Sequence, residues 1–195
     1  MSAHADAIAA HLRGLAATAE RVAAELSDDI GAVAERVLDA MQRDATLFFC
    51  GNGGSAADAQ HLATEYVVRF RTNRRPLRAI ALTTDTSLLT AAANDLGFEE
   101  IFARQVAALG RAGDILFLHS TSGDSPNLVA AARAARAAGV TTIALLARGG
   151  GALRGAVDVA LVLPTDVGAH AQECHLAIGH AICDIVERRA AEARA

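Results

Sequence analysis

The chain has 195 residues, of which 52% are hydrophobic and only 4% aromatic, and it carries a formal net charge of −4 at pH 7. This length suits one domain with an ordinary core, and the negative charge argues against a nucleic acid held through its phosphate backbone. No segment reaches the roughly 18 to 20 apolar residues that a membrane-spanning helix needs, and residues 1–14 have no cationic region followed by an apolar stretch, so we expect a cytoplasmic protein without a membrane partner.

Residues 3–43 are rich in Ala and carry apolar residues at helical spacing. The pattern begins with Ile8 and Leu12 and continues to Met41, with apolar residues three or four positions apart. The polar segment 27–29, Ser-Asp-Asp, interrupts this pattern, and such residues favour helix ends. We therefore predict two N-terminal helices with a break near residues 27–29.

From residue 44 onward, short apolar runs alternate with Ala-rich helical stretches. The runs of strand length and composition are residues 46–50, 79–82, 115–118, 141–146 and 157–163. This alternation indicates a mostly parallel five-stranded sheet with helices on both faces. We expect an α/β fold, a three-layer α-β-α sandwich of about residues 44–195, preceded by the helices of about residues 3–43 within a single domain of residues 1–195.

Ligands of such sheets bind at the carboxyl ends of the strands, and a Ser-rich loop follows the third run. Ser125 fits a helix N-cap and Pro126 fits the first helical position, which exposes backbone N–H groups at the start of the helix. Hydroxyls surround these groups, from Ser120, Thr121, Ser122 and Ser125. The loop is suited to a phosphate group, although an ordinary Ser-rich turn that caps a helix has the same composition.

A second loop, residues 51–55, also joins a strand to a helix, and its glycines allow a ligand to approach the backbone closely. Ser55 and Asp58 have the S-x-x-D spacing of a capping box. The loop matches neither the GxGxxG dinucleotide fingerprint nor a Walker loop, so we expect no nucleotide cofactor.

The helix that follows this loop carries polar residues at intervals of three and four, which places them on one face. They are Asp58, His61 and Glu65. Such a face is often simply solvated, but its position directly after a Gly-rich strand-to-helix junction favours a functional role.

The last helix, expected at about residues 170–189, mixes polar and apolar residues. Its polar members include Gln172, Glu173, His175 and His180, and polar groups on a helix that docks on the core need partners. We interpret His175 as a structural histidine in the core.

The cysteines, Cys50, Cys174 and Cys183, lie in apolar contexts without CxxC spacing. They are predicted to be buried reduced thiols rather than disulfides or a thiolate zinc site.

In combination, these motifs resemble the SIS-domain phosphoheptose isomerases. The resemblance lies in residues 50–70, with Gly-Asn-Gly-Gly-Ser-Ala-Ala-Asp-Ala-Gln-His followed by Glu65, in residues 120–127, and in the run from Gln172 to His180. It extends to residues 83–87 and to Asn94-Asp95. It implies conversion of D-sedoheptulose 7-phosphate to D-glycero-D-manno-heptose 7-phosphate, and a homotetramer with active sites at subunit interfaces.

The resemblance also implies roles for individual residues. Glu65 matches the base and His180 the acid of an aldose–ketose isomerisation through an enediol. The implied zinc ligands, for one ion per subunit, are His61, Glu65, Gln172 and His180. The implied substrate contacts are Asn52, Gly53, Gly54, Ser55, Glu65, Arg69, Asn94, Asp95, Ser120, Thr121, Ser122, Ser125 and Gln172.

Two alternatives stay open at this point. One is a non-catalytic SIS module, either a sugar-phosphate sensor or a scaffold like a replication-initiator-associating paralogue; that paralogue lacks the equivalents of Glu65 and His180, which are present here. The other is an isomerase of a different ketose phosphate, because His170-Ala171 stand where the family commonly has Arg-Ile.

Overall fold

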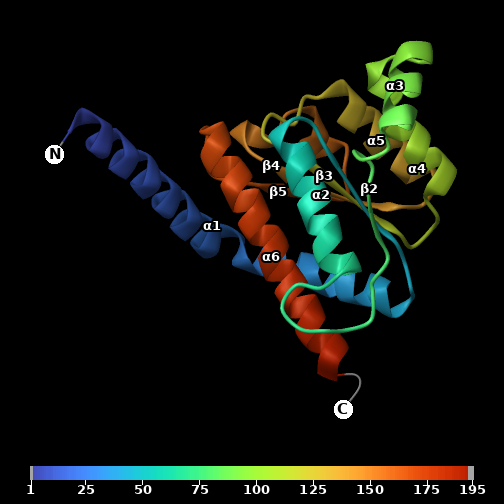
Figure 1. The fold of residues 1–195 in the computed structure, drawn as a ribbon, viewed down its shortest axis with the longest axis horizontal. Helices are drawn as coiled ribbons and strands as arrows, with labels where there is room; N and C mark the ends of the chain where they lie inside the picture. Colours follow the sequence, from blue (N-terminus) through green and yellow to red (C-terminus); the bar gives the residue numbers. More distant parts are fainter. Residues whose placement is uncertain (1, 193–195) are drawn as a thin grey trace.

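The computed structural model describes residues 2–192, which begin with one continuous helix, α1 (Ala3–Gln42). The predicted break near residues 27–29 is wrong. The hydroxyl of Ser27 donates to the carbonyl of Ala23 one turn earlier, so this polar side chain is satisfied without ending the helix. The N-terminal half of α1 extends away from the rest of the chain (Figure 1).

The five strands form one sheet in the order β2-β1-β3-β4-β5, and every pairing is parallel. The strands are β1 (Leu47–Gly51), β2 (Ala79–Ala81), β3 (Ile115–Ser120), β4 (Thr141–Leu146) and β5 (Val159–Val162). β1 and β3 lie in the middle and are buried at every position, which explains why they read as continuous apolar runs rather than alternating ones.

Helices cover both faces of the sheet, which confirms the predicted α/β sandwich (Figure 1). On one face, α2 (Gly54–Val67) and α6 (Gly168–Glu192) pack with α1 around inward side chains such as Phe49. On the other face, α3 (Thr86–Asp95), α4 (Ala103–Leu109) and α5 (Pro126–Ala137) pack around side chains such as Phe48. Short 3₁₀ helices span Phe98–Glu100, Arg148–Gly150 and Ala152–Gly155.

Two predictions about the core are confirmed. Cys50, Cys174 and Cys183 are unpaired and buried, and His175 is fully buried, with its Nε2 atom 3.3 Å from the carbonyl oxygen of Leu146. Over residues 2–192, none of the helices combines the length and the apolar character needed to cross a bilayer.

Candidate active site

Two loops lie side by side at the carboxyl edge of the sheet because the strands before them are paired. The register of β1 with β3 places Gly51 opposite His119, so the loop after β1 lies beside the loop after β3. The side chains of Asn52 and Asn127 exchange two hydrogen bonds, of 2.9 and 2.8 Å, across this boundary. The structure therefore brings together the two loops that the sequence indicated separately.

The loop after β3, which we call the phosphate loop (residues 120–125), is shaped by its own hydroxyls. Ser120 Oγ accepts a hydrogen bond from the N–H of Gly123, and Ser122 Oγ accepts one from Asp124. Ser125 is the N-cap of α5, as predicted, but its side chain makes no capping hydrogen bond. Within residues 2–192 the hydroxyls of Thr121 and Ser125 have no protein partner, so both are available to a ligand.

The loop after β1 differs from the sequence prediction at its cap. The N-cap of α2 is Gly53, with φ 58°, and Ser55 already lies within the first turn, so the capping box of Ser55 and Asp58 is wrong. Gly53 takes this left-handed conformation without the steric cost of a side chain. Gly51 is equally constrained, because a Cβ there would lie 2.6 Å from the carbonyl oxygen of Ser55.

Asp58, which was expected in the capping box and on the polar face of the helix, lies inside α2 beside His61 and is a further candidate residue of the site. Its side chain is buried, and Oδ2 has no hydrogen-bond partner among the described residues. Burial raises the pKa of this carboxyl to about 6, although His61 acts in the opposite direction. A buried, unpaired carboxylate next to the polar face of α2 is typical of a functional site rather than of a core.

Further along α2, the cluster of His61, Glu65 and His180 joins this helix to α6. The Nε2 atoms of the two imidazoles are 2.8 Å apart, and Glu65 Oε1 is 3.3 Å from His61 Nε2. One potential ligand atom from each residue lies within 4.8 Å of the others. Burial lowers the pKa of His180 and His61 lowers it further, while Glu65 opposes the shift.

The donor set of this cluster fits a metal ion. Two neutral imidazole nitrogens and a carboxylate oxygen suit Zn²⁺, and a site without thiolate that leaves a coordination position open is of the catalytic type. The ring of Phe70 covers one side, since it stacks on His180 with the ring centroids 5.3 Å apart. The cluster can therefore act as an acid/base pair or as a set of metal ligands.

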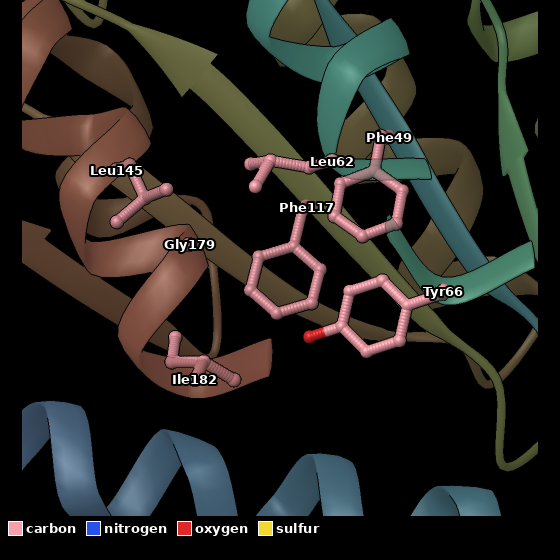
Figure 2. Close-up of a pocket in the computed structure, with 7 residues that line it drawn as sticks. All are labelled: Phe49, Leu62, Tyr66, Phe117, Leu145, Gly179 and Ile182. Carbon is pink, nitrogen blue, oxygen red and sulfur yellow. The ribbon is translucent and has the colours of Figure 1, made fainter. Parts of the chain in front are cut away.

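The close approach of α2 and α6 beneath the cluster has a structural cause in Gly179, the neighbour of His180. A Cβ at this position would lie 2.5 Å from Leu62 Cδ2, so a side chain here would collide with α2. Figure 2 shows Leu62 and Gly179 at a small apolar pocket together with Phe49, Phe117 and Tyr66. At about 10 Å³, this pocket barely has the volume of one water and excludes a sugar phosphate.

Gln172 lies at the start of α6, away from the cluster. Its side-chain amide packs against Gly54, where it occupies the space that a Cβ would need. Eight residues separate Gln172 from His180, which corresponds to about 12 Å along the helix axis. The structure thus places Gln172 beside the loop after β1 and does not bring it to His61, Glu65 and His180 of the same chain.

Three other expected substrate contacts lie apart from the phosphate loop. Asn94 and Asp95 are exposed at the end of α3, and the Asn94 side chain donates a hydrogen bond to Asp95. Arg69 is exposed just beyond α2, next to the Phe70 that stacks on His180. His170, which departs from the family pattern, is buried against α1 with its ring centroid 4.7 Å from that of His11.

Arg148 was missed by the sequence reasoning. It follows β4 at the same edge of the sheet and has φ 49°, which is rare for a residue with a side chain. The sequence feature that could have pointed to Arg148 is its position at the end of a predicted strand, directly before Gly149, Gly150 and Gly151.

Comparisons with known proteins show the family to which the chain belongs. Residues 10–147 match the SIS domain family. The chain is 54% identical to a phosphoheptose isomerase of Roseiflexus sp. (strain RS-1) over 159 residues, which cover 82% of this chain and 81% of the relative. It is 47% identical to the phosphoheptose isomerase of Paramagnetospirillum magneticum, over 95% of each chain.

Solved structures show the same likeness. A phosphoheptose isomerase from Francisella tularensis superposes with a TM-score of 0.92 at 37% identity, covering 96% of this chain and all of that one. A phosphoheptose isomerase from Neisseria gonorrhoeae has a TM-score of 0.89 at 41% identity, over 94% of this chain and 98% of that one.

Proposed function

The chain belongs to the SIS-domain family, among the phosphoheptose isomerases, and on this basis we propose that it converts D-sedoheptulose 7-phosphate to D-glycero-D-manno-heptose 7-phosphate. The observation that carries the proposal is the cluster formed by His61 and Glu65 of α2, the helix that starts at the ligand-binding edge of the sheet, and His180 of α6. A non-catalytic SIS module would not require this acid/base pair, so the enzyme is the better-supported reading.

In the proposed reaction, one base moves a proton between C1 and C2 and one acid serves the two oxygens. Glu65 carries the carbon proton, since a carboxylate both accepts it and returns it to the neighbouring carbon of the enediol. Without a metal, His180 accepts a proton from one oxygen and donates it to the other, and its lowered pKa favours the neutral imidazole that begins as the base. If His180 instead holds a metal, the ion would polarise the two oxygens.

We assign the phosphate of the substrate to the phosphate loop. The free hydroxyls of Thr121 and Ser125 and the positive N-terminal end of α5 support this assignment. The other proposed contacts are Asn52, Gly53, Gly54, Ser55, Glu65, Arg69, Asn94, Asp95, Ser120, Ser122 and Gln172.

We assign one Zn²⁺ per subunit to His61, Glu65, Gln172 and His180. When bound, the ion would polarise the oxygens at C1 and C2 and stabilise the charge that develops on the enediolate. The 12 Å or so between Gln172 and His180 along α6 supports a site to which two subunits contribute, because one straight helix does not present both side chains to one ion.

A homotetramer with sites at subunit interfaces would allow Gln172 of one subunit and His180 of another to contribute to the same site. The protruding half of α1 exposes Ile8 and Leu12, which are 62% and 57% accessible, as expected of a helix that packs on another copy. Co-assembled Gln172→Ala and His180→Ala subunits should recover part of the activity that each lacks alone. A mixed tetramer of verified composition without activity would contradict shared sites.

Two further assignments accompany this function. We place the whole chain, residues 1–195, in a single SIS domain, which the shared sheet and its two continuous cores support. We also place the protein in the cytoplasm, where reduced cysteines such as Cys50 are maintained.

The deciding experiment is an assay of purified protein with sedoheptulose 7-phosphate, in which aldose formation is measured with zinc and with a chelator. We expect turnover that the chelator abolishes and zinc restores. Absence of turnover by folded, zinc-loaded protein would refute the heptose assignment, and parallel assays with shorter ketose phosphates would then identify the substrate. Turnover that persists in the chelator would remove the metal from the mechanism.

A further inference from the structure

The backbone of Arg148 adopts a conformation that its side chain disfavours. Within residues 2–192, only Asp44 and Arg148 combine a side chain with a positive φ, of 58° and 49°. Asp tolerates this region because its short polar side chain bonds locally, whereas Arg gains no such compensation. Since glycine would fit this position without strain, the presence of Arg indicates that its guanidinium is used.

The guanidinium is held at the phosphate loop. Arg148 Nε donates a hydrogen bond of 3.1 Å to the carbonyl oxygen of Asp166, which leaves the two terminal nitrogens free to point elsewhere. A Cβ added to Gly168 would lie 3.1 Å from Arg148 Nη2 and 4.0 Å from Thr121 Oγ1. The guanidinium and a phosphate-loop hydroxyl thus both lie close to the same point next to Gly168.

The charges around this space favour an anion. Gly168 begins α6, whose N-terminal end carries partial positive charge, and the first turn of that helix contains no acidic residue. The carboxylates of Asp124 and Asp166 are near in the chain, but neither forms an ion pair with Arg148 within the described residues: Asp124 Oδ1 accepts a hydrogen bond from the N–H of Ala152, and Asp166 contacts Arg148 through its backbone carbonyl. A cation placed at a helix N-terminus is unfavourable unless an anion binds between them.

We propose that Arg148 is a substrate-binding residue that contacts the phosphate group of the ketose phosphate together with Thr121, and that it sets the preference for phosphorylated over unphosphorylated ketoses. This inference rests on the proposed function and extends it, because it gives the neutral phosphate loop a cationic partner. An exposed guanidinium that makes charge-assisted hydrogen bonds to a phosphate should change affinity by about 10-fold.

The test compares Arg148→Gly, Arg148→Lys and the control Arg133→Ala, which removes one exposed arginine from the outer side of α5. Arg148→Gly suits the positive φ, so we expect it to fold with an unchanged or higher Tm. Its KM for sedoheptulose 7-phosphate should rise about 10-fold with kcat within about twofold of the wild type, and Arg148→Lys should recover part of the loss. The control should match the wild type.

A second measurement keeps the two proposals separate. The affinity for inorganic phosphate, determined by calorimetry with zinc-loaded protein, should fall about 10-fold in Arg148→Gly whether or not the enzyme turns over. Unchanged KM and unchanged phosphate affinity in Arg148→Gly would refute the role of Arg148 while leaving the isomerase assignment intact. An inactive wild type would refute the isomerase assignment, and the phosphate affinities would still decide the role of Arg148.

Discussion

Glu187 on α6 anchors residues 70–72, which include the Phe70 that covers one side of the cluster of His61, Glu65 and His180, and its replacement by Gln gives a quantitative test of the structure. Its side chain is 4% exposed. The carboxylate accepts hydrogen bonds from the backbone N–H groups of Phe70, Arg71 and Thr72 and from the Thr72 hydroxyl, and Arg74 Nε lies 3.2 Å from Oε2. Burial alone would raise the pKa of Glu187, but these hydrogen bonds outweigh it and lower the pKa to about 2.

The expected cost follows from that shift. A pKa lowered from 4.5 to about 2 corresponds to roughly 3 kcal/mol of stabilisation at neutral pH. Glu187→Gln retains the shape of the side chain but turns an N–H₂ group toward donors and leaves Arg74 without a counter-ion. We expect its free energy of unfolding in urea at pH 7 to fall by about 3 kcal/mol, and Glu173→Gln, an exposed site on the same helix, to change it by less than about 0.5 kcal/mol.

The pH dependence has a defined sign. Because the folded pKa of Glu187 lies below the unfolded value, the stabilisation is present above pH 4.5 and is lost as the pH falls from there toward 2. The difference between wild type and Glu187→Gln should therefore shrink in that window, at a fixed protein concentration. Equal stability at pH 7, or a difference that stays constant down to pH 3, would refute the reasoning. Activity should also fall, since Phe70 stacks on His180.

Two further substitutions test the core beneath the site. Gly179→Ala adds a Cβ 2.5 Å from Leu62 Cδ2, so it should separate α2 from α6 and lower zinc content and activity. The double variant with Leu62→Val should recover part of both. A Gly179→Ala protein that is more stable and fully active would contradict this expectation. His119→Leu removes a fully buried imidazole whose two nitrogens have no hydrogen-bond partner in the described structure. Burial lowers the pKa of His119 to about 3, and the charge of His175 contributes to this shift. Below about pH 6.5 the imidazole of His119 binds a proton in the unfolded chain but not in the folded protein, so wild-type stability should fall between pH 6.5 and 3 more steeply than that of the variant. Thermal unfolding at pH 7.5 and at pH 5 measures this difference. An equal loss of Tm in both proteins would contradict a neutral, buried His119.

Local sequence determined much of the architecture. The five apolar runs became the five parallel strands. In β1 and β3, which are buried at every position, the cause is that residues buried on both faces of a sheet must be apolar throughout, whereas the edge strands β2 and β5 are only partly buried. The position of Ser125 and Pro126 likewise fixed the start of α5, since cap and first-turn preferences depend on adjacent residues alone. The i, i+4 spacing of His61 and Glu65 placed both on one helix face for the same reason.

Only the tertiary structure decided how these pieces meet. His61 and His180 are 119 residues apart in the sequence, and their contact depends on the packing of α2 against α6, which the lack of a side chain at Gly179 allows. Helical periodicity contains no information about either feature. Whether residues 27–29 end a helix depended on continued packing of α1 against the core, which overrode a weak local preference. The position of Arg148 beside the phosphate loop depends on a backbone turn and on close packing at Gly168, so it became visible only once the chain was folded.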